Sequence, residues 1–508
     1  MPAAPVREDP ARYRIEPTVL QALRSPRLLI REVLAGLVVA LALIPEAIAF
    51  SLIAGVDPRL GLFSSFVMAV AIAFLGGRPA MITAATGAIA LVIAPVARDH
   101  GVDYLIATVI LGGALQIVFA LLGVAKLMRF IPRSVMIGFV NALAILIFIA
   151  QLPQLIGPDV PWLVWPLVAA GIAILVVLPR LTRAVPAPLV TIVVVTGAVV
   201  ALGWQVPTVG DQGALPESLP SLLMPDVPFT IETLRIIAPY ALAMAVVGLL
   251  ESLMTAKLVD EITDTHSRKT REALGQGAAN ILSGAFGGMG GCAMIGQTMI
   301  NVKASGARTR ISTFLAGVFL LALVLVLGDV VAIIPMAALV AVMILVSAAT
   351  FDWHSIRPAT LRRMPASETA VMVITVIATV WTHNLAIGVV LGVVAAMVLF
   401  ARRVAHVVTV TRRIEPGEDA DLVRYVVDGE LFFASSNDLT TQFSYTDDPP
   451  HVVIDLSRSH IWDASSVVAL DAIVDRYARL GSSVAIEGLD ETASALHLRL
   501  SGHLGGGH

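Results

Sequence analysis

The sequence predicts a polytopic α-helical membrane protein with a small α/β domain at its C-terminus. The composition supports this, because 57% of the 508 residues are hydrophobic and only 14% are charged, whereas a soluble chain carries roughly 25% charge. Mean hydropathy is +0.86. Apolar runs recur between residues 34 and 403, and beyond Arg403 the pattern changes to short strands and an amphipathic helix.

The N-terminal segment, residues 1–33, is polar, rich in arginine and punctuated by proline. It contains no apolar stretch of the kind that a cleavable signal peptide requires. We therefore expect this segment to stay in the cytoplasm and the first apolar run to act as an uncleaved insertion signal.

Fourteen apolar runs follow, and a membrane-spanning helix needs about 17 to 25 such residues. We predict fourteen spans within a transmembrane domain at 34–403, although several runs are too short to cross a bilayer alone. The runs are 34–54, 61–76, 84–97, 104–123, 134–152, 161–179, 188–204, 236–256, 273–286, 292–302, 311–328, 331–349, 368–382 and 385–401.

The loop charges fit this count. With the N-terminus inside, eighteen Lys and Arg residues fall in inward-facing loops, and only Arg59, Arg98 and Arg235 fall in outward-facing loops. Such a bias is the usual orientation signal of membrane proteins. An even number of spans then places both termini in the cytoplasm. We expect the protein in the cytoplasmic (inner) cell membrane.

Two carboxylates, Glu46 and Glu251, lie inside apolar runs. A carboxylate at the bilayer centre costs about 2.5 to 3.5 kcal/mol, so such residues usually face a cavity or a partner. The alternative is a structural carboxylate bonded to backbone. Pro45 is predicted to break the helix beside Glu46, and Thr255 lies one turn after Glu251.

Two glycine-rich segments, 76–96 and 284–302, are predicted to be broken helices. Irregular backbone at membrane depth is tolerated only where protein or a water-filled cavity surrounds it. A helix that starts there directs its first N–H groups toward the cavity and favours an anion. Close helix packing through small residues is the alternative, but it explains five glycines within ten residues poorly.

The two halves, about 34–204 and 236–403, repeat one arrangement: a carboxylate on the first run and a short helix on the third. Because each half has seven runs, the second is inverted relative to the first. Paired interrupted segments of this kind point to a transporter site. We expect substrate binding where the short helices meet, with Glu46 and Glu251 beside it. The predicted substrate-binding residues are Thr83, Ala84, Thr86, Ala293, Met294 and Ile295.

The C-terminal region is predicted as a linker, 404–421, and a soluble domain, 422–508. Expected strands are Val423–Val427, Leu431–Ala434, His451–Leu456 and Val484–Glu487, and the expected helix is Ser465–Leu480, apolar at Val468, Leu470, Ile473 and Tyr477.

Several function classes are disfavoured. The sequence contains no zinc-binding HExxH, no phosphate-binding P-loop and no nucleophile-elbow GxSxG, so we do not expect an enzyme or a cofactor. A single cysteine, Cys292, excludes an intramolecular disulfide and a multi-cysteine metal site. A net charge of -3 argues against a nucleic-acid partner.

Three blocks resemble the SulP (solute carrier 26) anion transporter family. Residues 35–66 look like its first-span signature, residues 287–312 like its tenth-span region, and residues 452–488 like a STAS domain. Together they extend the resemblance over nearly the whole chain.

The resemblance implies core and gate domains within the seven-plus-seven repeat, a site between the third and tenth spans, an elevator-like motion and a homodimer held partly by STAS domains. Sodium-coupled relatives pair a carboxylate on the eighth span with hydroxyls there and on the tenth. Glu251 and Thr255 match this coupling pattern, but the tenth span has Ile295, so sodium is less expected than protons, with Glu251 or Glu46 as the proton carrier. Ala464 follows Asp463, so no phospho-switch is expected, and Ser465 and Ser466 are expected to cap the helix.

We therefore expect a secondary active anion transporter of the sulfate, bicarbonate or dicarboxylate class in the lipid bilayer, working by proton-coupled symport. One alternative is a sodium-coupled or uncoupled exchanger or channel. Another is an anion sensor that signals through the STAS domain.

Overall fold

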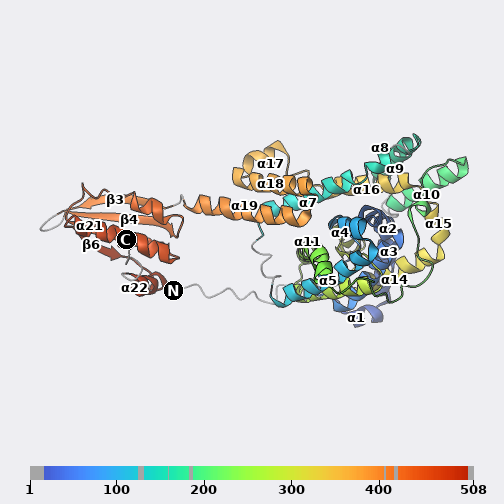
Figure 1. Ribbon diagram of the computed structural model, residues 1–508, viewed down its shortest axis with the longest axis horizontal. Coiled ribbons are helices and arrows are strands. Elements are labelled where there is room, and N and C mark those ends of the chain that lie inside the picture. Colours follow the sequence, from blue (N-terminus) through green and yellow to red (C-terminus); the bar gives the residue numbers. More distant parts are fainter. Residues whose placement is uncertain are drawn as a thin grey trace. The chain divides into compact units, whose positions relative to one another are not determined.

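The computed structural model describes residues 17–123, 131–157, 160–181, 187–405, 408–416 and 421–501. The chain divides into two compact units, Met1–Val393 and Val394–His508. Figure 1 traces their elements, helical in the first unit and α/β in the second.

The first unit contains helices on both sides of two very short strands. In chain order its elements are α1 (Val19–Arg24), α2 (Pro26–Ala54), α3 (Pro58–Leu75), β1 (Thr83–Ala84), α4 (Gly87–His100), α5 (Val102–Leu121), α7 (Arg133–Ile149), α8 (Pro153–Ile156), α9 (Val164–Leu181), α10 (Ala187–Leu202), the 3₁₀ turn η3 (Gly210–Gln212), α11 (Ile231–Thr263), α12 (Lys269–Ala285), β2 (Cys292–Ala293), α13 (Ile295–Met299), the π-helical turn η4 (Ile300–Ala304), α14 (Arg310–Val326), α15 (Gly328–Ala332), α16 (Met336–Thr350), α17 (Pro358–Arg363), α18 (Ala366–Thr382) and α19 (Leu385–Ala405), which continues into the second unit.

Each of the fourteen predicted runs overlaps a helix. Within the described residues, seven helices are long and apolar enough to cross a membrane, and α10, α14, α16 and α18 are shorter apolar helices. The helical membrane fold is as predicted, and the count of fourteen spans stays a prediction.

Helix α2 corrects one expectation, because it continues through Pro45 instead of breaking there. A proline removes only its own N–H bond, to the carbonyl four residues earlier, and adds a local clash. The surrounding residues Ile44, Ala47 and Ile48 are buried, and this packing holds the helix together on both sides of the proline.

The two halves meet through backbone. Strands β1 and β2 pair antiparallel, with Thr83 opposite Ala293 and Ala84 opposite Cys292. Next to this pair, a Cβ on Gly291 would lie 1.9 Å from the carbonyl oxygen of Ala84, so only glycine allows the strands to approach. The glycine run therefore serves close packing as well as the break in the helix.

Side chains of α12 hold Gly291, the residue before β2, in place. The Asn280 amide donates to the Gly291 carbonyl oxygen at 3.1 Å and accepts from the Gly291 N–H at 2.9 Å, and Gln276 donates to the same carbonyl at 2.9 Å. Asn280 also donates to Gln116 of α5. These bonds join α12 to the start of β2 and to α5.

Arg78 anchors the segment that leads to β1. Arg78 is buried, with 3% of the residue exposed. Its guanidinium lies 3.0 Å from Asp260 and donates to Thr263, the last residue of α11, and to Thr265 just beyond it. Asp260 also pairs with Lys269 at 2.7 Å. Since a buried charge needs such partners, this cluster ties the first half to the second.

The second unit contains a four-stranded sheet in the order β3–β4–β5–β6. The strands are β3 (Thr409–Glu415), β4 (Leu422–Leu431), β5 (His451–Ile461) and β6 (Ser483–Glu487), and the helices are α20 (Ser436–Thr440), α21 (Ala464–Arg479) and α22 (Glu491–Leu500). The pair β3–β4 is antiparallel, and the pairs β4–β5 and β5–β6 are parallel.

Two strand expectations were wrong. The segment 404–421 was predicted as a linker, but it contains β3, whose polar, charged residues suit an exposed edge strand. The segment Leu431–Ala434 was predicted as a strand, but β4 ends at Leu431 and the chain turns there.

Helix α21 forms where it was predicted, with two differences in detail. The residue that buries its side chain on the first turn is Val467, whereas Val468 is 39% exposed. The N-cap is Asp463, whose carboxylate accepts from the Ser466 N–H at 3.1 Å. An Asp at this position satisfies an unpaired helix N–H as well as a serine does, so Ser465 and Ser466 do not supply the cap.

A buried carboxylate organises the core of this domain. Asp448 accepts hydrogen bonds from Arg412, at 2.8 Å, and from the hydroxyls of Tyr425 and Tyr477. Burial, together with the bond to Asp448, raises the pKa of Tyr477, so its hydroxyl keeps the proton that it donates. The two tyrosines come from β4 and α21, so the carboxylate joins the sheet to the helix that covers it.

Candidate functional site

A cavity of about 300 Å³ lies beside the paired strands. The lining comes from α2, α4, α11 and α13 and from α7 and α16. The lining residues are Glu46, Phe50, Thr86, Gly87, Ala88, Phe139, Val140, Leu143, Ile147, Glu251, Met294, Ile295, Gly296, Val346, Ala349 and Thr350. Among these described residues there is no Lys or Arg.

The N-terminus of α4 faces this cavity. Thr86 is the N-cap residue, and its hydroxyl accepts from the Ile89 N–H at 3.5 Å. Gly87 and Ala88 follow it in the lining, and N–H groups at the first helical positions have no carbonyl of their own helix to bond. Together with the helix dipole, they place partial positive charge at the cavity.

Glu251 reaches the same cavity from α11 and is bonded by a thiol. The Cys292 Sγ donates to Glu251 Oε2 at 2.9 Å, and Sγ also lies 2.9 Å from Thr86 Oγ1. Glu251 is 7% exposed, and Cys292 is completely buried. Three polar groups from α4, β2 and α11 therefore form one chain.

Glu46 reaches the cavity from α2 and is bonded by an amide. Gln297 of α13 donates through Nε2 to Glu46 Oε1 at 2.8 Å. The amide oxygen of Gln297 is buried and has no hydrogen-bond partner among the described residues. Each carboxylate is thus held by a neutral donor from the second half of the chain.

The structure brings together five of the nine predicted site residues: Glu46, Glu251, Thr86, Met294 and Ile295. The other four do not line the cavity. Thr83, Ala84 and Ala293 are fully buried in the strand pair. Thr255 donates to the carbonyl oxygen of Glu251 at 2.8 Å, within its own helix, and does not contact the Glu251 carboxylate.

Several residues at the site were missed from the sequence. Gln297, which bonds Glu46 but does not line the cavity, lies two residues beyond Ile295, and its amide in an apolar segment was the available signal. Phe50, and Phe139 with Leu143 on α7, are ordinary apolar residues of helices. Nothing in the sequence distinguishes them from residues that pack in a core.

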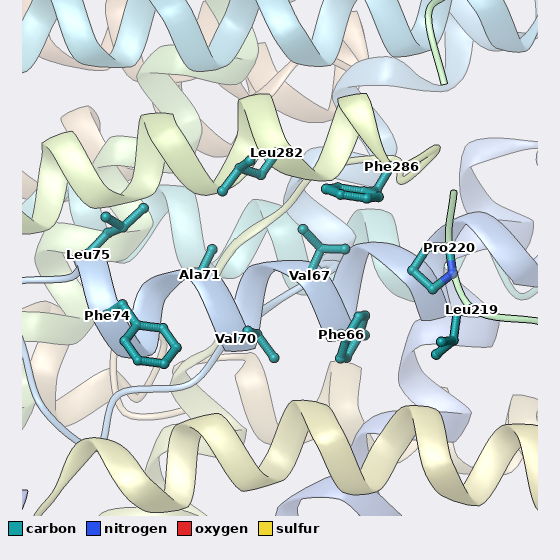
Figure 2. A pocket seen from close by; sticks show the side chains of 10 residues that line it. All are labelled: Phe66, Val67, Val70, Ala71, Phe74, Leu75, Leu219, Pro220, Leu282 and Phe286. Atoms are coloured by element: carbon teal, nitrogen blue, oxygen red, sulfur yellow. The ribbon is translucent and has the colours of Figure 1, made fainter. Parts of the chain in front are cut away.

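A second, larger groove differs in chemistry. It measures about 490 Å³ and is lined by residues of α3 and α12 and by Leu219 and Pro220. Figure 2 shows that its side chains are all apolar, from Phe74 and Leu75 at one end to Leu219 and Pro220 at the other. It offers no group that could recognise a polar solute, so the candidate site is the cavity beside β1 and β2.

Comparisons with known proteins agree with the fold. The murine Solute Carrier 26 family member A9 anion transporter, in the inward-facing state, superposes with a TM-score of 0.80 at 16% identity, over 96% of this chain and 88% of that one. The transmembrane domain of a cyanobacterial bicarbonate transporter, BicA, gives 0.64 at 24% identity, over 73% of this chain and 98% of that one.

In sequence, the chain is 52% identical to the "Putative sulfate transporter YbaR" of Bacillus subtilis (strain 168), over 92% of this chain and 96% of that one. It is 26% identical to the Bicarbonate transporter BicA of Picosynechococcus, over 77% of this chain and 73% of that one.

The fold therefore defines a multi-pass membrane protein of the transporter class with a C-terminal α/β domain. The model of the sulfate permease family matches residues 29–375, and that of the STAS domain matches residues 413–504. The chain belongs to the sulfate permease (SulP) family, a family of anion transporters.

Proposed function

We propose that this chain is a proton-coupled anion symporter, and one observation carries the proposal. The cavity places two carboxylates beside the helix N-terminus that would bind the anion, with no Lys or Arg among the described lining residues. At an effective dielectric constant of 20, two unit charges about 4 Å apart interact by about 4 kcal/mol. An anion therefore binds best when Glu46 or Glu251 is protonated.

The contacts of both carboxylates are compatible with gaining a proton. Gln297 donates to Glu46, and a rotation of its amide would present the unpaired oxygen as an acceptor for a protonated Glu46. Glu251 is bonded by a thiol and not by a cation. Among the described residues, the hydrogen-bond partners of both carboxylates are uncharged, so a proton is the natural counter-charge.

The shortage of oxygen ligands near Glu251 favours protons over sodium. A sodium site needs several oxygen ligands, as hard cations do generally. Ile295 offers none from its side chain, and the Thr255 hydroxyl bonds the backbone of its own helix. We therefore assign Glu251, or Glu46, to proton carriage.

An elevator-like motion would use the difference between two groups of lining elements. The elements α2, α4 and α11 carry both carboxylates and Thr86, whereas α7 and α16 contribute apolar side chains and Thr350. Apolar side chains make few directional bonds, so the polar elements could slide along α7 and α16 without breaking a network.

The substrate class is a small anion such as sulfate, bicarbonate or a dicarboxylate. The cavity volume and the names of the relatives YbaR and BicA both support this class. We further propose a homodimer in the cytoplasmic membrane with both termini inside.

Uptake into proteoliposomes tests the proposal, with labelled sulfate, bicarbonate and fumarate in parallel. Symport predicts that an inward proton gradient stimulates uptake of one anion and that collapsing the gradient with a protonophore removes the stimulation. Uptake that ignores the gradient would indicate an exchanger or a channel. Specific binding without uptake would indicate a sensor.

A further inference from the structure

We propose that Cys292 is a positioning residue that transmits the protonation state of Glu251 to the anion-facing hydroxyl of Thr86. This inference rests on the proposed proton coupling and names the device by which the proton and the anion bind together. It concerns a residue that does not itself line the cavity.

The geometry provides a continuous chain. The Cys292 sulfur lies 2.9 Å from Glu251 Oε2 on one side and 2.9 Å from Thr86 Oγ1 on the other. Thr86 and Glu251 both line the cavity, whereas Cys292 is buried behind them in β2. Either Thr86 or Cys292 can be the donor in their shared bond.

Counting hydrogens defines the first state, in which Glu251 is ionised. A carboxylate only accepts, so the single thiol proton of Cys292 points to Glu251. The sulfur then has only lone pairs for Thr86, and the Thr86 hydroxyl donates to it. In this state Thr86 presents only an oxygen lone pair to the cavity, so its hydroxyl offers the anion no donor.

Protonation of Glu251 at Oε2 reverses the chain. The new carboxyl O–H donates to the sulfur, and the Cys292 S–H turns to Thr86 Oγ1. The Thr86 hydroxyl then accepts from Cys292 and Ile89, which uses its two lone pairs, and its proton is released toward the cavity. One proton is gained, no covalent bond other than O–H changes, and the anion gains one donor.

A thiol suits this position because it is a weak donor and a weak acceptor, so neither direction of the chain is strongly preferred. Of the two described residues bonded to it, Thr86 is uncharged and Glu251 is the titratable one. The neighbouring Ser252 is bonded to Gln276 and to the Ala293 N–H. Glu46, from α2, is the other titratable residue of the described lining, and it is held separately by Gln297.

The experiment measures the KM for labelled sulfate in proteoliposomes at acidic and at alkaline pH, for the wild type, Cys292→Ala and Cys292→Ser. In the wild type the KM should be lower at acidic pH for two reasons: the charge of Glu251 is removed, and one donor is released to the anion, which is worth about tenfold by itself. Cys292→Ala interrupts the chain but leaves the carboxyl group, so the ratio of alkaline to acidic KM should fall about tenfold below the wild-type ratio and keep the part that comes from the charge. Cys292→Ser can donate and accept, and should keep the ratio.

The outcomes separate the two proposals. A wild type whose uptake ignores pH and the proton gradient overturns the proposed function. A pH-dependent wild type with an equally pH-dependent Cys292→Ala overturns the relay alone. If Cys292→Ala does not fold, Thr86→Val and Thr86→Ser decide: the relay predicts that the ratio of alkaline to acidic KM falls about tenfold in Thr86→Val, while Thr86→Ser keeps the wild-type ratio. A Thr86→Val variant with the full wild-type ratio contradicts the relay.

Discussion

The thiol of Cys292 donates a hydrogen bond to the carboxylate of Glu251, with 2.9 Å between Sγ and Oε2. The other carboxylate of the cavity, Glu46, likewise accepts from a neutral group, the amide of Gln297. Carboxylates in membrane proteins usually pair with a cation or line a functional path. Here neither is neutralised by its bonded partner, so the negative charge of the site depends on protons.

Replacing each carboxylate by its neutral amide tests this dependence. Glu251→Gln and Glu46→Gln each make one position of the site permanently neutral. Anion uptake should therefore lose part of its stimulation by acid in each variant, and all of it in the double variant. Uptake at graded pH in proteoliposomes measures the effect. Glu261→Gln is the control, because Glu261 lies exposed on the same helix as Glu251 and pairs with Lys257 at the surface. If the double variant kept the full pH dependence, the coupling assignment would be wrong.

Gly291→Ala should prevent the two halves from pairing. The new Cβ would lie 1.9 Å from the Ala84 carbonyl oxygen, and a clash with backbone cannot be relieved by a rotamer change. We expect a loss of about 3 kcal/mol, together with loss of anion uptake. Thermal unfolding in detergent measures the first effect, with Gly296→Ala as the control, since nothing lies within 4 Å of a Cβ there. Equal melting temperatures for the two variants would contradict the close approach.

Arg78→Met should destabilise the first unit much more than Lys257→Met. Arg78 is buried against Asp260, and removal of one partner from a buried ion pair typically costs about 3 to 5 kcal/mol. Because Lys269 still pairs with Asp260, the lower end of that range is expected. Lys257, 69% exposed in its pair with Glu261, should cost less than about 1 kcal/mol. Similar melting temperatures would show that the Arg78 cluster is not structural.

Asp448→Ala should loosen the STAS domain. Its removal leaves the hydroxyls of Tyr425 and Tyr477 and the guanidinium of Arg412 without their shared acceptor, at a cost of about 3 kcal/mol. Hydrogen exchange of the β4 and α21 amides in the full chain should accelerate by about a hundredfold. The adjacent Asp447→Ala is the control, because Asp447 contributes a backbone carbonyl and not its side chain. If the β4 and α21 amides of Asp448→Ala exchanged as slowly as in the wild type, Asp448 would not stabilise this domain.

Much of the fold and half of the site follow from the sequence because their signals are strong. Glu46 and Glu251 are charges in hydrocarbon, and the glycine runs before α4 and α13 mark broken helices. Contacts that depend on the rotation of a helix leave no such signal. For this reason Gln297 was missed, and the bond from Thr255 to its own backbone was not foreseen. Strand β3 was hidden because an exposed edge strand carries the same charged residues as a linker.

The pairing of β1 with β2 also constrains how the molecule is made. Thr86 and Cys292, which meet beside this pair, lie 206 positions apart, and the ribosome completes the first half long before the second exists. Until β2 arrives, the backbone of β1 has no partner strand at membrane depth, where unpaired N–H and C=O groups are costly. The cavity is therefore a late product of biosynthesis, because a nascent chain that stops short of Ala293 lacks strand β2 and the lining residues that follow it.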